Sequence, residues 1–497
     1  MSQILYHSTR DSKKAEVLSS AAAIKQGLAS DGGLFVPGEL PALSETAVKA
    51  LIPLTYPERA AKILSLFLTD YSEDELLTDC KAAYAEASFP GGAAPLRQIN
   101  ENTASLELWH GPTAAFKDMA LQIMPRLLSR ALVKTEERRT ALILVATSGD
   151  TGKAALEGYK DIPQIKMMVF YPIDGVSRVQ KLQMATQTGN NVSVMAIKGN
   201  FDDAQSGVKK IFGDSDAAEM LNKNGCFFSS ANSINWGRLA PQIVYYVSAY
   251  CDLLAEGKLR YGDAMNVCVP TGNFGNILAA YIAKKMGLPV GKLICASNSN
   301  NVLTEFLQTG TYSRNRPFHL TMSPSMDILI SSNLERLLYF TAGSEKTAAY
   351  MKDLKEKGCY TVEPQILEQI QADFEGYCCS EDDCLETVGR YFDSYGYLAD
   401  THTAVALYCA DLRRSGNRRI IVDSTASPYK FAPAVAKALG LDNSGEDTEI
   451  FARISEHTNT PIPSPLSSVF GKEIRFTKTV DSVEMKEAVR EFTDSLA

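Results

Sequence analysis

The chain has 497 residues, of which 45% are apolar and 22% are charged, as in ordinary globular proteins, and this length predicts two or three domains. Its formal net charge of −8, without any run of Lys or Arg, argues against nucleic acid as the main partner. No apolar run approaches the roughly 20 residues that span a bilayer. The N-terminus lacks the pattern of a secretory signal, so we expect neither a membrane span nor export.

The cysteines and histidines argue against a metal site. Ten cysteines are scattered along the chain, and their one cluster, YCCSEDDC at 377–384, has neither CxxC spacing nor a nearby histidine. The five histidines include no HExxH pair. We therefore expect no metal, and a reduced, cytoplasmic protein with several buried thiols.

The first hundred residues mix polar and apolar stretches around a Gly/Pro-rich loop, SDGGLFVPGELP. A lysine in an unusual setting follows them. In LELWHGPTAAFKDMALQ at 106–122, Lys117 comes after a Gly-Pro-Thr turn and Phe116, just before an apolar helical pattern. Most lysines are solvated surface residues, and a buried lysine needs a partner or a chemical task.

From residue 141 onward, short apolar runs alternate with polar helical stretches of 10 to 15 residues. This alternation predicts a parallel sheet with crossover helices. The expected strands are ALILVA at 141–146, IKMMVFYP at 165–172, NVSVMAIKG at 191–199 and CFFSS at 226–230.

A long amphipathic helix, interrupted by Pro241, is expected over 234–254, and the alternation then restarts. The later strands are NVCVP at 266–270, KLICASN at 292–298 and RRIIVDS at 418–424. We therefore predict an α/β fold with two open, mainly parallel sheets. The expected division is an N-terminal region at 1–98, a large domain at 99–135 and 232–497, and a smaller α/β domain at 136–231.

The turn TSGDTGKAA at 147–155 does not meet the P-loop pattern, because Thr147 and Ala154 stand where Gly and Ser or Thr are needed. What remains is a turn of small residues between a strand and a helix. Such a turn offers backbone N–H groups and hydroxyls to an anion. A simple turn with helix-capping hydroxyls is the equally weighted alternative.

The turn PTGNFGNIL at 270–278 also follows a strand and opens a helix, but it lacks the third glycine of a dinucleotide fingerprint. Gly272 and Gly275 allow a close approach to an oxygen-rich ligand. The unpaired N–H groups at the helix start make this turn a candidate phosphate receptor.

The third candidate, SSANSINWGRLA at 229–240, places Arg238 in the first turn of a helix. The positive end of the helix dipole makes this an unfavourable position for a cation, and a bound anion would relieve the conflict. A solvated surface arginine is the alternative. One chemistry explains Lys117 together with two turns suited to phosphate: a Schiff base between the lysine and pyridoxal phosphate, with the cofactor phosphate held elsewhere.

At this point the sequence resembles the threonine synthase family. HGPTAAFKDMA is similar to that family's cofactor-lysine motif, and ATSGDTG to its loop beside the cofactor. VPTGNFGN resembles its cofactor-phosphate loop, and STASPYKF the loop at the pyridine nitrogen. Further similar blocks, including GNFDDAQSGVKKIF and SPSMDILISSNLERLL, extend the resemblance over roughly residues 8 to 435.

The resemblance implies the pyridoxal-phosphate fold shared with tryptophan synthase β, with an added N-terminal region. It implies that Lys117 is the Schiff-base lysine and that Thr425 gives its hydroxyl to the pyridine nitrogen. The residues implied for the cofactor phosphate are Gly272, Asn273, Phe274, Gly275 and Asn276. The candidates for the substrate carboxylate are Thr147, Ser148, Gly149, Asp150 and Thr151, and those for the substrate phosphate are Ser233, Asn235 and Arg238.

The implied reaction converts O-phospho-L-homoserine and water into L-threonine and phosphate, as the last step of threonine biosynthesis. In it, Lys117 would act as a movable base at Cα and Cβ, which requires a pKa well below the usual 10.4 of lysine. Two departures from the expected pattern leave local contacts open. Asp150 stands where wider relatives often have Asn, and Ser427 and Tyr429 stand where we expect TAHPAKF.

Four other functions compete with this one. A phospholyase would bind the same anion, whereas a serine/threonine dehydratase would not need Arg238. A catalytically silent binding module would not need Lys117 together with both turns, and a nucleotide-binding protein lacks its fingerprints. We expect a small-molecule substrate and a monomer or homodimer.

Overall fold

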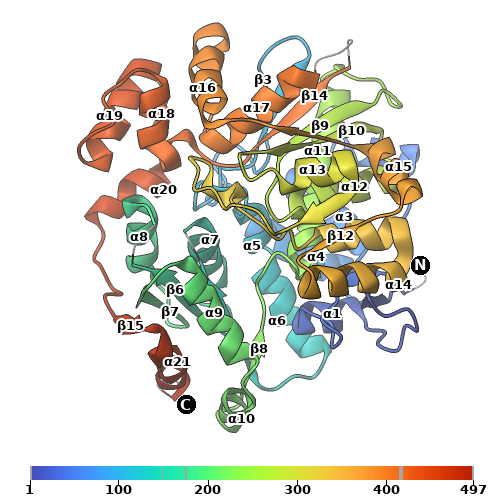
Figure 1. Ribbon diagram of the computed structural model, residues 1–497, viewed down its shortest axis with the longest axis vertical. Coiled ribbons are helices and arrows are strands. Elements are labelled where there is room, and N and C mark those ends of the chain that lie inside the picture. The colour runs from blue at the N-terminus through green and yellow to red at the C-terminus, as the bar shows by residue number, and fades with distance from the viewer. Residues whose placement is uncertain (1–2, 148, 174–175, 414–417, 495–497) are drawn as a thin grey trace.

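The structure is a computed structural model that describes residues 3–147, 149–173, 176–413 and 418–494. Two sheet domains lie side by side, and the N-terminal region packs against the larger one (Figure 1). The prediction of an α/β protein with two mainly parallel sheets is confirmed.

The N-terminal region is a small helical layer with one antiparallel strand pair. It is fixed to the large domain by an aromatic contact and an ion pair. The Trp236 ring lies 5.5 Å from that of Tyr6 and 5.7 Å from that of Phe67, and the guanidinium of Arg59 lies 2.5 Å from the Asp252 carboxylate. Its elements are β1 (Tyr6–Ser8), α1 (Ser20–Gln26), β2 (Phe35–Pro37), α2 (Glu45–Leu51), α3 (Tyr56–Ser65) and α4 (Glu73–Ala83).

The large domain contains a six-stranded sheet in the order β13-β10-β9-β14-β4-β3. All its pairs are parallel except the edge pair β3 and β4. The strands are β3 (Leu96–Gln98), β4 (Thr103–Glu107), β9 (Met265–Pro270), β10 (Val290–Ser297), β13 (Phe374–Cys378) and β14 (Ile420–Ser424). Because the carboxyl ends of parallel strands meet at one edge, the turns after β4, β9 and β14 lie close together.

Helices and a short antiparallel pair surround this sheet. The pair is β11 (Thr311–Ser313) and β12 (Cys359–Thr361). The helices are α5 (Asp118–Leu121), α6 (Met124–Lys134), α11 (Trp236–Ala255), α12 (Gly275–Lys285), α13 (Val302–Thr309), α14 (Leu334–Glu356), α15 (Pro364–Asp373), α16 (Glu381–Tyr395), α17 (Thr401–Arg413), α18 (Ala432–Ala438), α19 (Asp447–Thr458) and α20 (Ser464–Ser467). The expected amphipathic helix, α11, is instead buried on nearly every side, because the N-terminal region covers it.

The smaller domain has a five-stranded parallel sheet in the order β15-β7-β6-β5-β8. Its strands are β5 (Thr140–Ala146), β6 (Ile165–Pro172), β7 (Val192–Lys198), β8 (Cys226–Ser229) and β15 (Thr479–Asp481). Its helices are α7 (Asp150–Tyr159), α8 (Arg178–Ala185), α9 (Phe201–Phe212), α10 (Ser215–Lys223) and α21 (Met485–Asp494).

The last part of the chain differs from the expected division. We assigned 232–497 to the large domain, but β15 pairs with β7 and α21 packs beside α10 at the smaller sheet (Figure 1). The three-residue strand β15 has no apolar run that could reveal it in the sequence.

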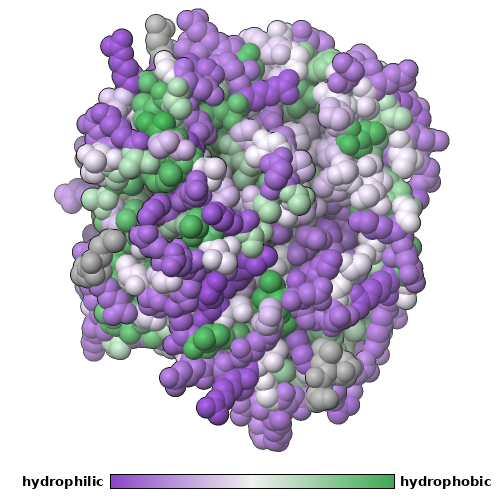
Figure 2. Space-filling view, turned by 180° about the vertical axis from the view of Figure 1, so that it is seen from behind, coloured by the Kyte–Doolittle hydropathy of each residue, from purple (hydrophilic) through white to green (hydrophobic). Residues whose placement is uncertain are grey.

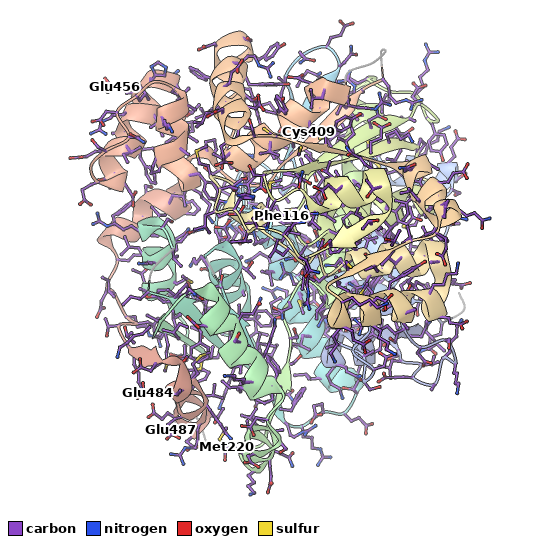
Figure 3. All side chains as sticks on the ribbon, in the orientation of Figure 1. Phe116, Met220, Cys409, Glu456, Glu484 and Glu487 are labelled. Carbon is purple, nitrogen blue, oxygen red and sulfur yellow. The ribbon has the colours of Figure 1, made fainter. Side chains whose placement is uncertain are left out.

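In the described ranges, no helix is long and apolar enough to cross a membrane. The face shown in Figure 2 is mostly hydrophilic, with small scattered hydrophobic patches. Phe116, which precedes the unusual lysine, lies near the centre of the molecule, far from Met220 at one tip (Figure 3).

Candidate active site

Lys117 lies at the carboxyl edge of the large sheet, in the turn that joins β4 to α5. The turn is held by Asp118, whose carboxylate accepts hydrogen bonds from the Thr113 N–H at 2.8 Å and the Thr113 hydroxyl at 2.7 Å. It is also paired with the segment after β14, since the Phe116 N–H donates to the Thr425 carbonyl at 2.8 Å. Two segments far apart in sequence therefore fix the base of the lysine.

The side chain of Lys117 is only 11% exposed. Its Nζ lies 3.7 Å from the Asp150 carboxylate and 3.4 Å from the Ser325 hydroxyl oxygen. Burial lowers the pKa of Lys117; Asp150 opposes this, while the cations of Lys430 and Arg238 lower the pKa further. This is the direction that a lysine base needs.

Asp150, at the start of α7, links the two domains through ion pairs. The Lys430 ammonium lies 2.6 Å from its Oδ1, and the Gln180 amide donates to it at 2.8 Å. Burial alone would raise the pKa of Asp150, but the charges of Lys430 and Lys117 hold it well below its usual range. The carboxylate that stands in place of an expected amide is therefore an anion between two lysines.

The turn at 147–151 is stabilised from within. The Thr147 hydroxyl accepts hydrogen bonds from the N–H groups of Gly149 and Gly152, both at 3.0 Å. Gly149 has a φ of 147°, and a Cβ there would lie 2.5 Å from the Gln180 side chain. Thr151 lies in the first turn of α7, and Ser148 lies outside the described residues.

The turn at 272–276 leads from β9 into α12. Phe274 adopts a left-handed conformation with φ 64°, and the segment at 331–333 supports the turn from one side. The Ser331 hydroxyl donates to the Gly272 carbonyl at 2.8 Å, and the Asn333 amide donates to the Asn273 carbonyl at 3.1 Å. The turn thus keeps the start of α12, with Gly275 and Asn276, in place for an anion.

Asn276 is the most buried polar member of this turn. The Tyr246 hydroxyl lies 2.6 Å from both the Asn276 Oδ1 and the Asp423 Oδ2. Burial raises the pKa of Asp423 to about 7, an effect that the hydrogen bond from Tyr246 partly opposes. The buried Nδ2 of Asn276 has no hydrogen-bond partner in the described structure.

The segment at 233–238 contributes a buried cation. Arg238 donates from Nη1 to the Ala231 carbonyl at 2.9 Å, while its buried Nε has no partner among the described residues. Burial lowers the pKa of Arg238 to about 10. Asn235 caps α11 and donates to the carbonyls of Ile24 and Ser230, so its amide is already used, and Ser233 is half-buried beside it.

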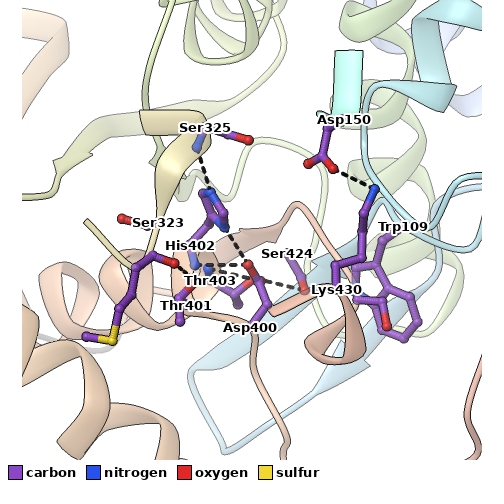
Figure 4. A network of polar contacts seen from close by, with 12 residues as sticks. Trp109, Asp150, Ser323, Ser325, Asp400, Thr401, His402, Thr403, Ser424 and Lys430 are labelled. Atoms are coloured by element: carbon purple, nitrogen blue, oxygen red, sulfur yellow. Dashed lines mark hydrogen bonds and ion pairs between the residues drawn. The ribbon is translucent and has the colours of Figure 1, made fainter. Parts of the chain in front are cut away.

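Sequence reasoning missed Lys430, Ser325 and His402. Lys430 also donates to the Thr113 carbonyl at 2.9 Å, so it joins the cofactor-lysine turn to Asp150. Figure 4 shows this ion pair beside the contacts of Ser325 with His402. Lys430 belongs to the TASPYKF motif quoted above, so the sequence could have indicated it as a buried lysine of the site.

Comparison with known proteins places this site in a family. Three family models match in chain order: "Threonine synthase N terminus" at residues 5–84, "Pyridoxal-phosphate dependent enzyme" at 92–420 and "Threonine synthase, C-terminal" at 403–492. The chain belongs to the threonine synthase family. The second model covers Lys117 and both glycine-rich turns, and pyridoxal 5′-phosphate is the cofactor of this fold.

Individual threonine synthases are similar over nearly the whole chain. The enzyme of Saccharomyces cerevisiae is 34% identical over 98% of each chain, and that of Schizosaccharomyces pombe is 37% identical over 88% of this chain and 90% of its own. A solved structure of PLP-bound threonine synthase from Brucella melitensis has a TM-score of 0.88, with 35% identity over 99% of both chains. Human "Threonine synthase-like 1" is 43% identical over 85% of this chain, which spans only 58% of that longer protein.

The residues of the site fit this cofactor. Lys117 is a poorly exposed amine with a lowered pKa, and the start of α12 offers main-chain N–H groups to a phosphate. Thr425 directly follows β14 and lies against the lysine turn through the bond to Phe116. The unpartnered donors of Arg238 and Asn276 are buried polar atoms that a ligand could satisfy.

Proposed function

We propose that the protein is a threonine synthase that converts O-phospho-L-homoserine and water into L-threonine and phosphate. The observation that carries this proposal is the charge of the buried site. The cations of Lys117, Lys430 and Arg238 interact there with the carboxyl groups of Asp150 and Asp118. Such a set of cations, removed from water, favours an anionic ligand.

In this proposal, Lys117 attaches the cofactor and Gly272 to Asn276 hold its phosphate. Thr425 would offer a neutral hydroxyl to the ring nitrogen. When bound, pyridoxal phosphate withdraws electrons from the substrate α-carbon. Arg238 holds the substrate phosphate, because its free Nε and its charge suit an oxygen-rich anion.

Lys117 then performs the proton transfers. Freed by the incoming substrate, its amine would remove the proton at Cα and afterwards one at Cβ, so that phosphate leaves from Cγ. A proton is then returned to Cγ, water adds at Cβ, and a final proton returned to Cα completes threonine. Asp150, 3.7 Å away, stabilises the ammonium that Lys117 forms each time it holds a proton. The hydroxyls of Thr147 and Thr151, in the turn beside Lys117, are the proposed donors to the substrate carboxylate, whereas the Gly149 N–H is already bonded to the Thr147 hydroxyl.

One incubation tests the proposal. Purified holoenzyme is mixed with O-phosphohomoserine, and phosphate, threonine and 2-oxobutyrate are quantified together. Equal amounts of phosphate and threonine support a synthase, whereas phosphate with 2-oxobutyrate identifies a phospholyase. An Arg238→Met variant should raise the KM for the phosphorylated substrate by about 10- to 100-fold. Failure to release phosphate would overturn the proposal.

We also infer that the protein works in a reducing, cytoplasmic compartment. All ten cysteines are free, and most are buried. Free thiols in this number are typical of proteins that the cytosol keeps reduced. Localisation of a fluorescent fusion to a membrane-enclosed, oxidising compartment would contradict this inference.

A further inference from the structure

Ser325 is the hydroxyl residue beside the lysine that the mechanism above leaves without a task. It lies in a single 3₁₀ turn, η1 (Pro324–Met326), and its side chain is exposed toward the lysine. Its Oγ accepts a hydrogen bond from the Lys117 Nζ at 3.4 Å. A hydroxyl on such a short turn is useful to a catalytic amine only if something fixes the turn.

Two contacts fix the main chain of Ser325. Its N–H donates to the Nε2 of His402 at 3.1 Å. Its carbonyl oxygen packs against Gly272, where a Cβ would lie only 2.7 Å from that oxygen. The 3₁₀ turn is therefore packed between the start of α17 and the turn at 272–276, and these contacts restrict its movement.

The hydrogen bonds of His402 determine its tautomer. Because Nε2 accepts from the Ser325 N–H, the ring hydrogen must be on Nδ1, which lies 2.8 Å from the Asp400 Oδ2. The ring is 2% exposed and packs 4.6 Å from the ring of Phe431, so water does not compete for either nitrogen.

Asp400 is in turn fixed by the start of α17. Its Oδ2 also accepts from the His402 N–H at 2.9 Å, and its Oδ1 accepts from the Thr403 N–H at 3.1 Å and from the Thr403 hydroxyl (Figure 4). An anionic side chain is favourable at a helix N-terminus. Helix capping explains the contacts with the main chain of α17, but it does not explain why a buried imidazole reaches out to Ser325.

We propose that Asp400 and His402 are positioning residues that hold Ser325 beside Lys117, so that the Ser325 hydroxyl orients the lysine amine between its proton transfers. A lysine that serves two carbons has a flexible stem, and a fixed hydrogen-bond partner restricts the directions its amine can take. This inference rests on the proposed role of Lys117 as the base.

The kinetic test compares five variants of the holoenzyme. Ser325→Ala and His402→Phe should each lower kcat by roughly 10- to 100-fold, as expected for a misplaced catalytic group, with KM changed by less than about twofold. The double variant should be no slower than the slower single variant, because both changes remove the same effect. His402→Gln, whose amide oxygen can accept from the Ser325 N–H, should recover part of the activity. His457→Phe, at an exposed histidine, is the matched control and should keep full activity.

A second measurement does not depend on turnover. Long-range ¹H–¹⁵N spectra of histidine-labelled protein should show His402 as the Nδ1–H tautomer, and Ser325→Ala should leave that tautomer unchanged. An Nε2–H tautomer, or a Ser325→Ala variant with wild-type kcat, would overturn the inference. If the wild-type protein releases no phosphate, the proposed function fails, and the spectra still decide how His402 is bonded.

Discussion

The turns after β5 and β9 have the same topology but opposite electrostatics. Each follows a strand of a parallel sheet and opens a helix, α7 or α12. The first has Asp150, an anion between two lysines, in the helical turn. The second is backed by Asp423, whose pKa is raised to about 7 by burial and which forms no ion pair in the described part of the chain.

This difference shows how the site divides its work. Charge is concentrated where protons are proposed to move, next to the Lys117 amine. The proposed receptor for a phosphate, which brings two negative charges of its own, consists of main-chain N–H groups and neutral side chains. A second anion behind that receptor would repel the ligand, and the raised pKa of Asp423 acts in the direction that reduces this repulsion.

Lys117→Ala should have the largest effect, because it removes the proposed base and the cofactor attachment. We expect turnover to fall by at least about 1,000-fold and the cofactor absorbance to change. Lys209→Ala, at an exposed position on α9, is the control and should match the wild type. If Lys117→Ala kept its turnover, Lys117 would not be the base, and the proposed difference in role between the two turns would be wrong.

Asp150→Asn should lower turnover by about 10- to 100-fold and weaken folding by about 3–5 kcal/mol, because it leaves the buried Lys430 unpaired. Asp150 raises the pKa of Lys117, so its loss should shift the rising limb of the pH–kcat profile to lower pH. Adding Lys430→Met should restore part of the stability. If the rising limb of the pH–kcat profile moved to higher pH instead, Asp150 would not be raising the pKa of Lys117.

Gly272→Ala tests the turn at 272–276, the proposed phosphate receptor built from neutral groups. The new Cβ would lie 2.7 Å from the Ser325 carbonyl oxygen, so the turn must shift, at a cost of about 1–3 kcal/mol. We expect cofactor affinity, measured by titration of the apoprotein, to fall by about 10-fold or more. Gly213→Ala, where the nearest atom lies at an ordinary 3.5 Å, should not change it.

Asp423→Asn should have the smallest effect on turnover, within about threefold, if that carboxyl is already neutral. Its effect is on the pH dependence of stability. From about pH 4 to the folded pKa of about 7, the unfolded chain releases a proton that the folded protein keeps, so wild-type stability falls as pH rises. The variant lacks this slope and should be more stable above pH 7 by up to about 4 kcal/mol. Urea unfolding at pH 5 and pH 8 measures the difference.

The sequence predicted what depends on local pattern. Apolar runs located β5, β6, β9 and β14 to within a residue or two, and the resemblance gave the family that the comparisons confirm. The contacts of Lys430 with Asp150 and of His402 with Ser325 could not be predicted, since they join segments far apart in the chain. The burial of α11 was missed for the same reason, because its cover comes from the N-terminal region.

The return of β15 to the small sheet has a mechanical consequence. The chain passes between the large and small domains three times, before β5, after β8 and before β15. A swinging motion of the small domain, with Asp150 on it, would have to bend three connections at once. The third of them ends in the edge strand β15, which is hydrogen-bonded to β7. Pulling on the end of α21 would therefore load the small sheet first and reach Lys117 through α7, which bears Asp150 and packs against α5.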